Sequence, residues 1–275
     1  MTDPDVTTTQ PTSGSNPVWM WLAGAFLALV LVAGGVALYA SRGGDDPTAA
    51  PTPAPPSPAS IKDQGDGFGT PITDRWGDRI EVPVNQFGQV LTQDSSQQLK
   101  PDEPGWMTDP ARDVMWQLVY NIPVPFSTSD GPTRVADKVA SGYAQTPQGM
   151  VLAAMDTMSR CSVPGDALAV ACYEHRVTDG PVYEEMGTRV AKIGALPRQL
   201  TPGASLPPLS WAKVVNYADD YAAVELAQRD PRSADTYIVY LVEMVWVDGD
   251  WKMKATDTSH QGRVGVTNLE GFTKW

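Results

Sequence analysis

The segment that most constrains this chain is an uncharged stretch of 23 residues near its N-terminus, Val18–Ala40. As a helix it would be ~34 Å long, enough to cross a hydrocarbon core of ~30 Å. Trp19 and Tyr39 lie near its two ends, where interfacial aromatic residues are enriched. A cleaved signal peptide would need a basic start and a shorter apolar stretch. Residues 1–17 contain no Lys or Arg, so we expect a single transmembrane helix at 18–40 that is not cleaved.

The orientation of this helix rests on features that favour opposite sides. Arg42, the basic residue closest to the span, lies after it, which by the positive-inside rule favours a cytoplasmic C-terminal side. The short acidic tail, the composition of the following linker and the two cysteines favour the reverse. We therefore expect a short cytoplasmic tail at 1–17 and an extracytoplasmic C-terminal domain, in a protein of the cell membrane.

A Pro/Ala/Thr-rich linker is expected at 41–65. Its centre, PTAAPTPAPPSPAS at 47–60, favours an extended polyproline II conformation and cannot form a core. A plain disordered linker is the other interpretation and has the same geometry. Either way, the linker separates the membrane helix from a folded domain.

The first part of that domain, residues 66–135, is expected to be extended and partly irregular. Arg79–Val84 alternates like a short strand, and a proline near its end confines it to a sheet edge. Asp109–Pro110 is an N-cap followed by proline at the first helical position, so we predict a short helix from there to about Val119. The turn-rich segment 121–135 is predicted to be a loop.

The second part, residues 136–275, is predicted to contain helices followed by strands. Thr146–Pro147 repeats the cap-plus-proline pattern and predicts a helix to about Arg160, and two more helices are predicted at 166–177 and 181–195. Four β-rich segments follow: Trp211–Tyr217, Tyr221–Gln228, Thr236–Val247 and Asp250–Thr256. The short turns between them predict an antiparallel meander, with Thr236–Val247 as a central strand covered on both faces. The expected fold class is α+β.

This order of elements resembles the NTF2-like fold, a cystatin-like cone in which N-terminal helices pack on a curved antiparallel sheet. The hairpin VWVDGDWKM at 245–253 is of the kind that ends such a sheet. The whole plan, with one span, a proline-rich linker and such a domain, is similar to that of bitopic assembly proteins of conjugative and type IV secretion systems.

Several stretches are also similar to an uncharacterised membrane-anchored family of high-GC Gram-positive bacteria. They are FGTPITDRWGDRIEVPVNQFG at 68–88, PVPFSTSDGPTRV at 123–135, ASGYAQTPQGMVLAA at 140–154, VDGDWKM at 247–253 and NLEGFTKW at 268–275. Members of that family are often encoded near conjugative transfer functions. The resemblance carries no established activity, so it implies a role in transfer through neighbourhood and architecture alone.

The charge of the chain limits its partners. The net charge is −12, and residues 61–275 have 28 acidic and 19 basic side chains. General nucleic-acid binding requires a basic field, so we expect no direct contact with nucleic acid. Two cysteines and two histidines are too few for a zinc ribbon, and no phosphate loop or dinucleotide fingerprint is present. We expect neither a cofactor nor a metal.

Candidate catalytic residues are few. His175 lies beside charged residues on a predicted helix, so we expect it to face solvent or to join a salt bridge, and His260 lies in a polar tail, so we expect it to be exposed. Asp219 and Asp220 are turn formers between two predicted strands. None of these residues forms a pattern that points to catalysis or metal binding.

Glu243 is singled out among the acids because its neighbours in the β-rich segment Thr236–Val247 are apolar. Inside a cone it would have a raised pKa and could act as a base in a pocket. The alternative is that it pairs with Lys252 or Lys254 on the next strand. Both interpretations stay open at the level of sequence.

Cys161 and Cys172 are eleven residues apart, at the end of one predicted helix and in the middle of the next. In an extracytoplasmic domain two cysteines so close favour a disulfide. Two buried free thiols are the alternative.

These features favour a membrane-anchored scaffold without enzymatic activity. It would bind other protein subunits of a conjugative transfer or type IV secretion-like apparatus, or further copies of itself as a homo-oligomer. Two alternatives stay open. One is a ligand-binding or small-molecule enzyme domain that uses the pocket of the cone with Glu243, and the other is an ectodomain that binds the cell envelope.

Overall fold

The computed structural model describes residues 65–163, 167–195, 207–257 and 261–275. The chain divides into two units, Met1–Pro47 and Thr48–Trp275, and the described residues all belong to the second. The predicted membrane helix and nearly all of the predicted linker therefore lie outside the described residues. None of the helices in the described ranges combines the length and the apolar character that crossing a bilayer requires.

Three α-helices lie within the described residues, where the sequence predicts them. They are α3 (Pro147–Arg160), α4 (Ala167–Arg176) and α5 (Tyr183–Gly194), and a short 3-10 helix, η1 (Ser95–Gln97), precedes them. Thr146 caps α3, because its Oγ1 accepts a hydrogen bond from the Gly149 N–H at 2.9 Å. Every residue of α3 is buried, so this helix forms the centre of the core.

The helices pack with a mixed sheet of seven strands in the order β13–β8–β9–β10–β11–β7, with β12 also paired to β10. The strands are β7 (Val177–Thr178), β8 (Trp211–Tyr217), β9 (Tyr221–Arg229), β10 (Tyr237–Val247), β11 (Asp250–Lys254), β12 (Arg263–Val266) and β13 (Thr273–Lys274). Strands β8 to β11 are consecutive and antiparallel, which confirms the predicted meander. The short strand β7 lies parallel to β11. The domain is α+β, as predicted.

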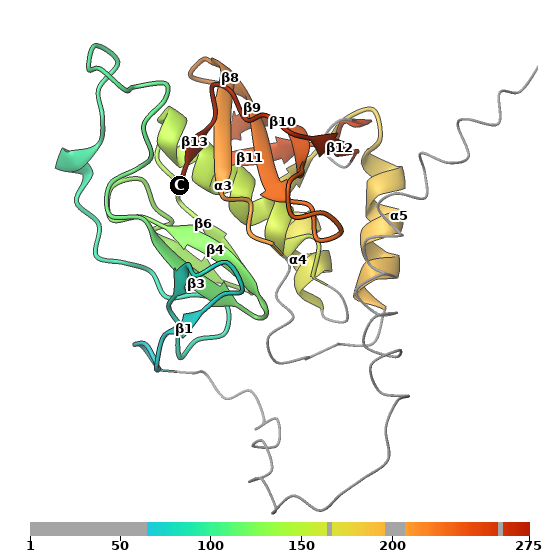
Figure 1. The fold of residues 1–275 in the computed structure, drawn as a ribbon, viewed down its shortest axis with the longest axis horizontal. Helices are drawn as coiled ribbons and strands as arrows, with labels where there is room; N and C mark the ends of the chain where they lie inside the picture. Colours follow the sequence, from blue (N-terminus) through green and yellow to red (C-terminus); the bar gives the residue numbers. More distant parts are fainter. Residues whose placement is uncertain (1–64, 164–166, 196–206, 258–260) are drawn as a thin grey trace, which may run out of the picture. The chain divides into compact units, whose positions relative to one another are not determined.

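The two faces of this sheet differ in burial. Helix α3 runs behind the strands in Figure 1 and packs against β8 to β11. On β10, Val242 and Met244 are fully buried, whereas the alternating residues Leu241, Glu243 and Val245 point to the opposite face and are half-buried. The expectation that this strand is covered on both faces therefore holds along the face that packs on α3, and on the other face only near the start of the strand, where Val239 is 1% exposed.

Residues 65–145 contain three short hairpins joined by longer connections. Strand β1 (Ile72–Thr73) pairs with β2 (Arg79–Ile80), β3 (Met115–Val119) pairs with β4 (Ile122–Phe126), and β5 (Arg134–Ala136) pairs with β6 (Val139–Ser141). The predicted helix at 109–119 is wrong, since its second half is β3. The predicted loop at 121–135 is wrong in part, since it contains β4 and the start of β5.

The hairpin of β3 and β4 forms because the side chains of β4 are buried in an apolar cluster. All five residues of β4 are buried. Its apolar side chains form a cluster with residues of β3, with Val163 after α3 and with Leu168 of α4. Asp113 and Tyr120 have positive φ angles of 46° and 58°, so the backbone turns sharply at both ends of β3. A helix there would leave the buried strand β4 without its antiparallel partner.

Candidate functional site

The histidine and aspartate candidates from the sequence do not form a site. His175 is exposed on α4, and His260 lies outside the described residues. In the turn between β8 and β9, the backbone carbonyl of Asp219 accepts a hydrogen bond from Gln145 Nε2 at 2.6 Å, and that of Asp220 accepts one from the Trp246 N–H at 2.9 Å. In the described part of the chain, no group of three or more His, Cys, Asp and Glu side chains could hold a metal ion.

Glu243 lies in the middle of β10, opposite Ala223 of β9, on the face that α3 does not cover. The hydroxyl of Tyr221 donates a hydrogen bond to it. Burial, and to a lesser degree this bond, raises the pKa of Tyr221. Of the two lysines considered as partners for Glu243, Lys252 instead binds Asp248, with Nζ and Oδ2 3.0 Å apart. Glu243 is thus held by a tyrosine on the neighbouring strand.

A buried salt bridge joins two residues one turn apart on α3. Asp156 Oδ1 and Arg160 Nε are 2.7 Å apart, and both side chains are fully buried. Arg160 also donates hydrogen bonds to the backbone carbonyls of Lys138 at 2.9 Å and Phe87 at 2.8 Å. This guanidinium therefore connects α3 to two segments of the N-terminal half of the domain. Its charge is balanced by Asp156 inside the core.

A second buried salt bridge, between Arg176 of α4 and Asp250 of β11, lies close to Tyr143. Nη1 of Arg176 is 2.5 Å from Oδ2 of Asp250. The Arg176 guanidinium carbon is 5.4 Å from the centre of the Tyr143 ring. Burial, together with the negative charge of Asp156, raises the pKa of the Tyr143 hydroxyl well above its usual range. The phenol therefore stays neutral at physiological pH.

Asp130 is the third buried acid with several bonds. Its carboxylate accepts hydrogen bonds from Ser129 Oγ and from Thr146 Oγ1, both at 2.5 Å. Burial raises the pKa of Asp130, and the two hydroxyl donors partly offset that rise. Because Thr146 is also the cap of α3, Asp130 fixes the start of the central helix.

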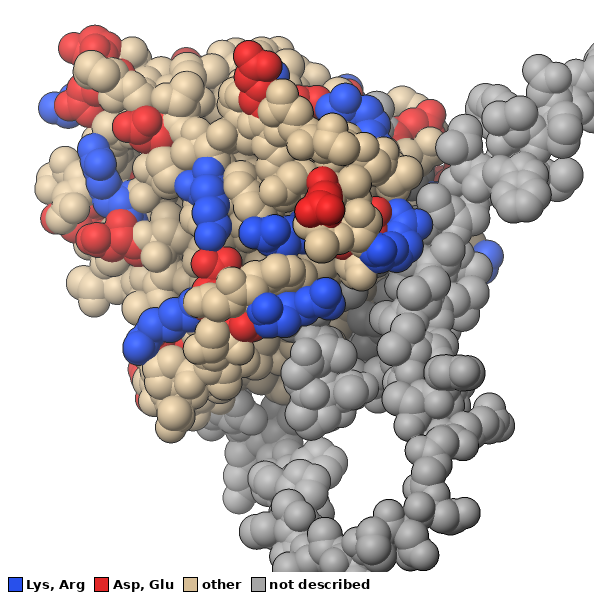
Figure 2. Space-filling view, in the orientation of Figure 1, with Lys and Arg blue, Asp and Glu red and all other residues tan. Residues whose placement is uncertain are grey.

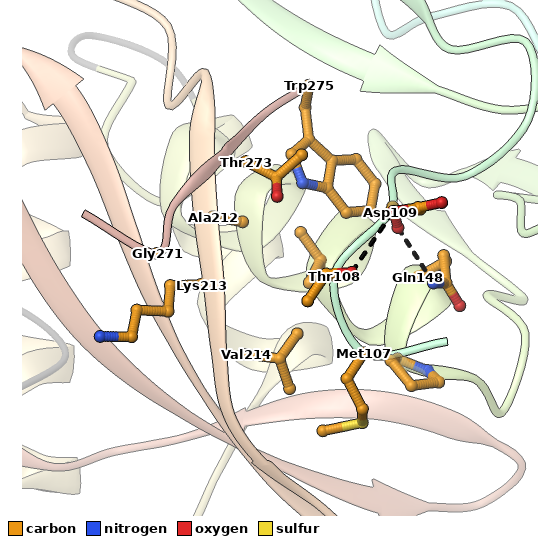
Figure 3. Close-up of a pocket in the computed structure, with 12 residues that line it drawn as sticks. Met107, Thr108, Asp109, Gln148, Ala212, Lys213, Val214, Gly271, Thr273 and Trp275 are labelled. Atoms are coloured by element: carbon orange, nitrogen blue, oxygen red, sulfur yellow. Dashed lines mark hydrogen bonds between the residues drawn. The ribbon is translucent and has the colours of Figure 1, made fainter. Parts of the chain in front are cut away.

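A cavity of about 40 Å³ lies between the start of α3, strand β8 and the segment around β13 (Figure 3). We call it the α3–β8 cavity. Buried residues of α3 and β8 form its floor: Pro147, Gln148, Val151 and Ala212. Exposed residues form its rim: Met107, Thr108, Asp109 and Lys213. A volume of this size holds about three water molecules, and a substrate pocket is usually several times larger. Glu243 is not among the residues that line it.

The side-chain amide of Gln148 is the polar group on the floor of the α3–β8 cavity. Its Nε2 donates to the backbone carbonyls of Trp106 and Asp109, both at 3.0 Å, and the bond to Asp109 is drawn in Figure 3. Both N–H groups are used, so the orientation of the amide is fixed. Its Oε1 is buried and has no hydrogen-bond partner within the described structure. This oxygen is itself enclosed by the protein, so it is not open to the cavity.

The structure joins Cys161 and Cys172 in a disulfide with Cα atoms 5.2 Å apart. It connects the residue after α3 to the middle of α4. Both cysteines are buried, so the bond lies in the core rather than at the surface.

Residues 81–274 match the model of the family described as Domain of unknown function (DUF8175). The chain belongs to this family. The DUF8175 match begins directly after β2 and contains the rest of the domain up to residue 274, with the disulfide and all lining residues of the α3–β8 cavity except Trp275. No curated protein and no solved structure matches the chain.

The buried polar groups of this DUF8175 domain were not predicted from the sequence. Asp156 and Arg160 stand one turn apart in an otherwise uncharged helix, a pattern that could have indicated an internal ion pair. Gln148 directly follows the cap and proline of α3, but nothing local indicates that its amide oxygen stays unpaired. Asp250 lies in the predicted hairpin, and its partner on α4 is 74 residues away.

Proposed function

We propose that this DUF8175 protein is a single-pass membrane protein whose extracytoplasmic domain assembles other subunits of a conjugative transfer or type IV secretion-like apparatus. The observation that carries the proposal is that the buried charged side chains form salt bridges and hydrogen bonds within the domain. Asp156, Arg160, Arg176 and Asp250 are bonded to one another and to the backbone. A catalytic acid or base must be within reach of its substrate, whereas the two polar atoms of this set that have no hydrogen-bond partner in the described structure, Asp156 Oδ2 and Arg176 Nε, are buried. A domain that uses its charges internally is better suited to holding partners.

The disulfide supports the extracytoplasmic location. Such bonds persist in oxidising compartments and are rare where thiols are kept reduced. Cys161 and Cys172 belong to the part of the chain after the uncharged segment Val18–Ala40. A membrane helix at 18–40 with its N-terminus in the cytoplasm would put this bond on the oxidising side.

The arrangement of the domain supports an NTF2-like fold as the finer description. The helices α3, α4 and α5 precede the meander of β8 to β11, and α3 packs on one face of it. The hairpin of β10 and β11, with Asp248–Gly249 at its turn, ends the meander. This is the order that the NTF2-like cone requires.

The surface supports protein partners rather than nucleic acid. Figure 2 shows basic and acidic side chains interspersed on the face that it presents, where the described residues form no continuous basic patch. Several charged side chains of the described residues pair with one another, such as Arg263 with Glu225 at 2.5 Å. Exposed apolar residues are scattered over different elements: Ile72, Val215 and Val264. Single exposed apolar residues are normal on a protein surface, so these three serve as positions at which contacts with other chains can be tested.

Site-specific photo-cross-linking of the full-length chain in its native membrane tests this function. A cross-linking residue is placed at Ile72, Val215 or Val264, and the exposed polar position Asp235 is the control. We expect at least one apolar position to give a discrete adduct with a second copy or with a membrane-anchored subunit of the apparatus, and Asp235 to give none. Monomer without adducts at all three apolar positions would overturn the proposal.

A further inference from the structure

We draw no further inference here: the strongest candidate, the surface patch on the face of β8 to β11 opposite α3, where Val215 and Val247 are exposed and Leu241 and Val245 are half-buried, carries no proposal because nothing in the structure shows what covers it.

Discussion

Arg176, the last residue of α4, and Asp250, the first residue of β11, form a salt bridge that fastens the helical half of the domain to the sheet. The Asp250 carboxylate also accepts hydrogen bonds from the backbone N–H groups of Gly142 at 2.8 Å and Trp251 at 2.9 Å. Nη2 of Arg176 donates to the carbonyl of Trp251 at 2.6 Å. One carboxylate thus joins α4, the segment after β6 and the hairpin strand β11.

Asp250→Ala should therefore be among the most damaging single substitutions in the domain. It leaves the Arg176 guanidinium, whose side chain is 2% exposed, without its counter-charge. Breaking a buried pair from one side costs about 3–5 kcal/mol, and we expect a loss of that size in the free energy of unfolding. Urea unfolding of the full-length chain in detergent, followed by tryptophan fluorescence, measures it.

Lys252→Met is the matched control, because it breaks a salt bridge on the same strand to an exposed acid, Asp248. Exposed pairs contribute about 0–1 kcal/mol, so this variant should unfold close to the natural chain. Equal losses for Asp250→Ala and Lys252→Met would show that the buried pair has no special role.

The sequence predicted the place of Asp250 but not its role. The turn at Asp248–Gly249 and the strand after it follow from local patterns, and both are confirmed. The partner of Asp250 lies on α4, and no local pattern links a hairpin to a helix so far away in the chain. The same reason explains why Gln148, Asp130 and the α3–β8 cavity were not predicted.

Asp130 should make the free energy of unfolding of the domain decrease as the pH rises. Its pKa is raised by burial, so the native state binds a proton more tightly than the unfolded state. The favourable contribution of protonated Asp130 is complete below the ordinary aspartate pKa of about 3.9 and is lost as the pH rises through the native value. Asp130→Asn cannot titrate. We expect the stability of the natural chain relative to this variant to fall as the pH rises from about 4, as measured by urea unfolding at several pH values.

Asp94 provides a control of opposite sign. Hydrogen bonds, first from the Ser96 side chain and then from Gln97, lower its pKa. Its contribution is therefore present above the ordinary aspartate pKa and is lost as the pH falls through the native value. Relative to Asp94→Asn, the natural chain should gain stability as the pH rises. The difference in stability between the natural chain and each Asn variant should therefore change with pH in opposite directions for Asp130 and Asp94. A change in the same direction for both would contradict the role of burial at Asp130.

The disulfide should hold α3 and α4 together by restricting the unfolded chain. Its two cysteines are eleven residues apart, and a loop of that size contributes about 3 kcal/mol in the chain-entropy model. Replacing both Cys161 and Cys172 by Ser should lower the free energy of unfolding by that amount. Maleimide labelling of the denatured chain should find no thiol before reduction and two after it. Two labelled thiols without reduction would show that the bond is absent.

The same local pattern succeeded once and failed once. Thr146–Pro147 begins α3, and Asp109–Pro110, with the same cap and proline, begins no helix. The two segments differ in the partners of the residues after the cap. After Thr146 the apolar residues pack against the sheet, whereas Met115–Val119 pairs with β4, a strand buried along its whole length. A capping pattern describes one helix end, and tertiary pairing decides whether the helix forms.

Gly149 tests how closely the start of α3 is packed. In most helices a change from glycine to alanine is stabilising by about 1 kcal/mol, because glycine has the larger conformational entropy when unfolded. At Gly149 a Cβ atom would overlap the backbone carbonyl and N–H of Ala144, which are not the flexible end of a side chain. We therefore expect Gly149→Ala to lower the free energy of unfolding by about 1–3 kcal/mol, as overpacking a core does.

Gly69→Ala is the control, since the nearest atom to its Cβ would be the Val82 carbonyl oxygen at 3.7 Å, an ordinary contact. A gain in stability at Gly149, as in an open helix, would mean that the segment before α3 moves away at little cost and that Thr146 and Asp130 do not fix the start of the helix.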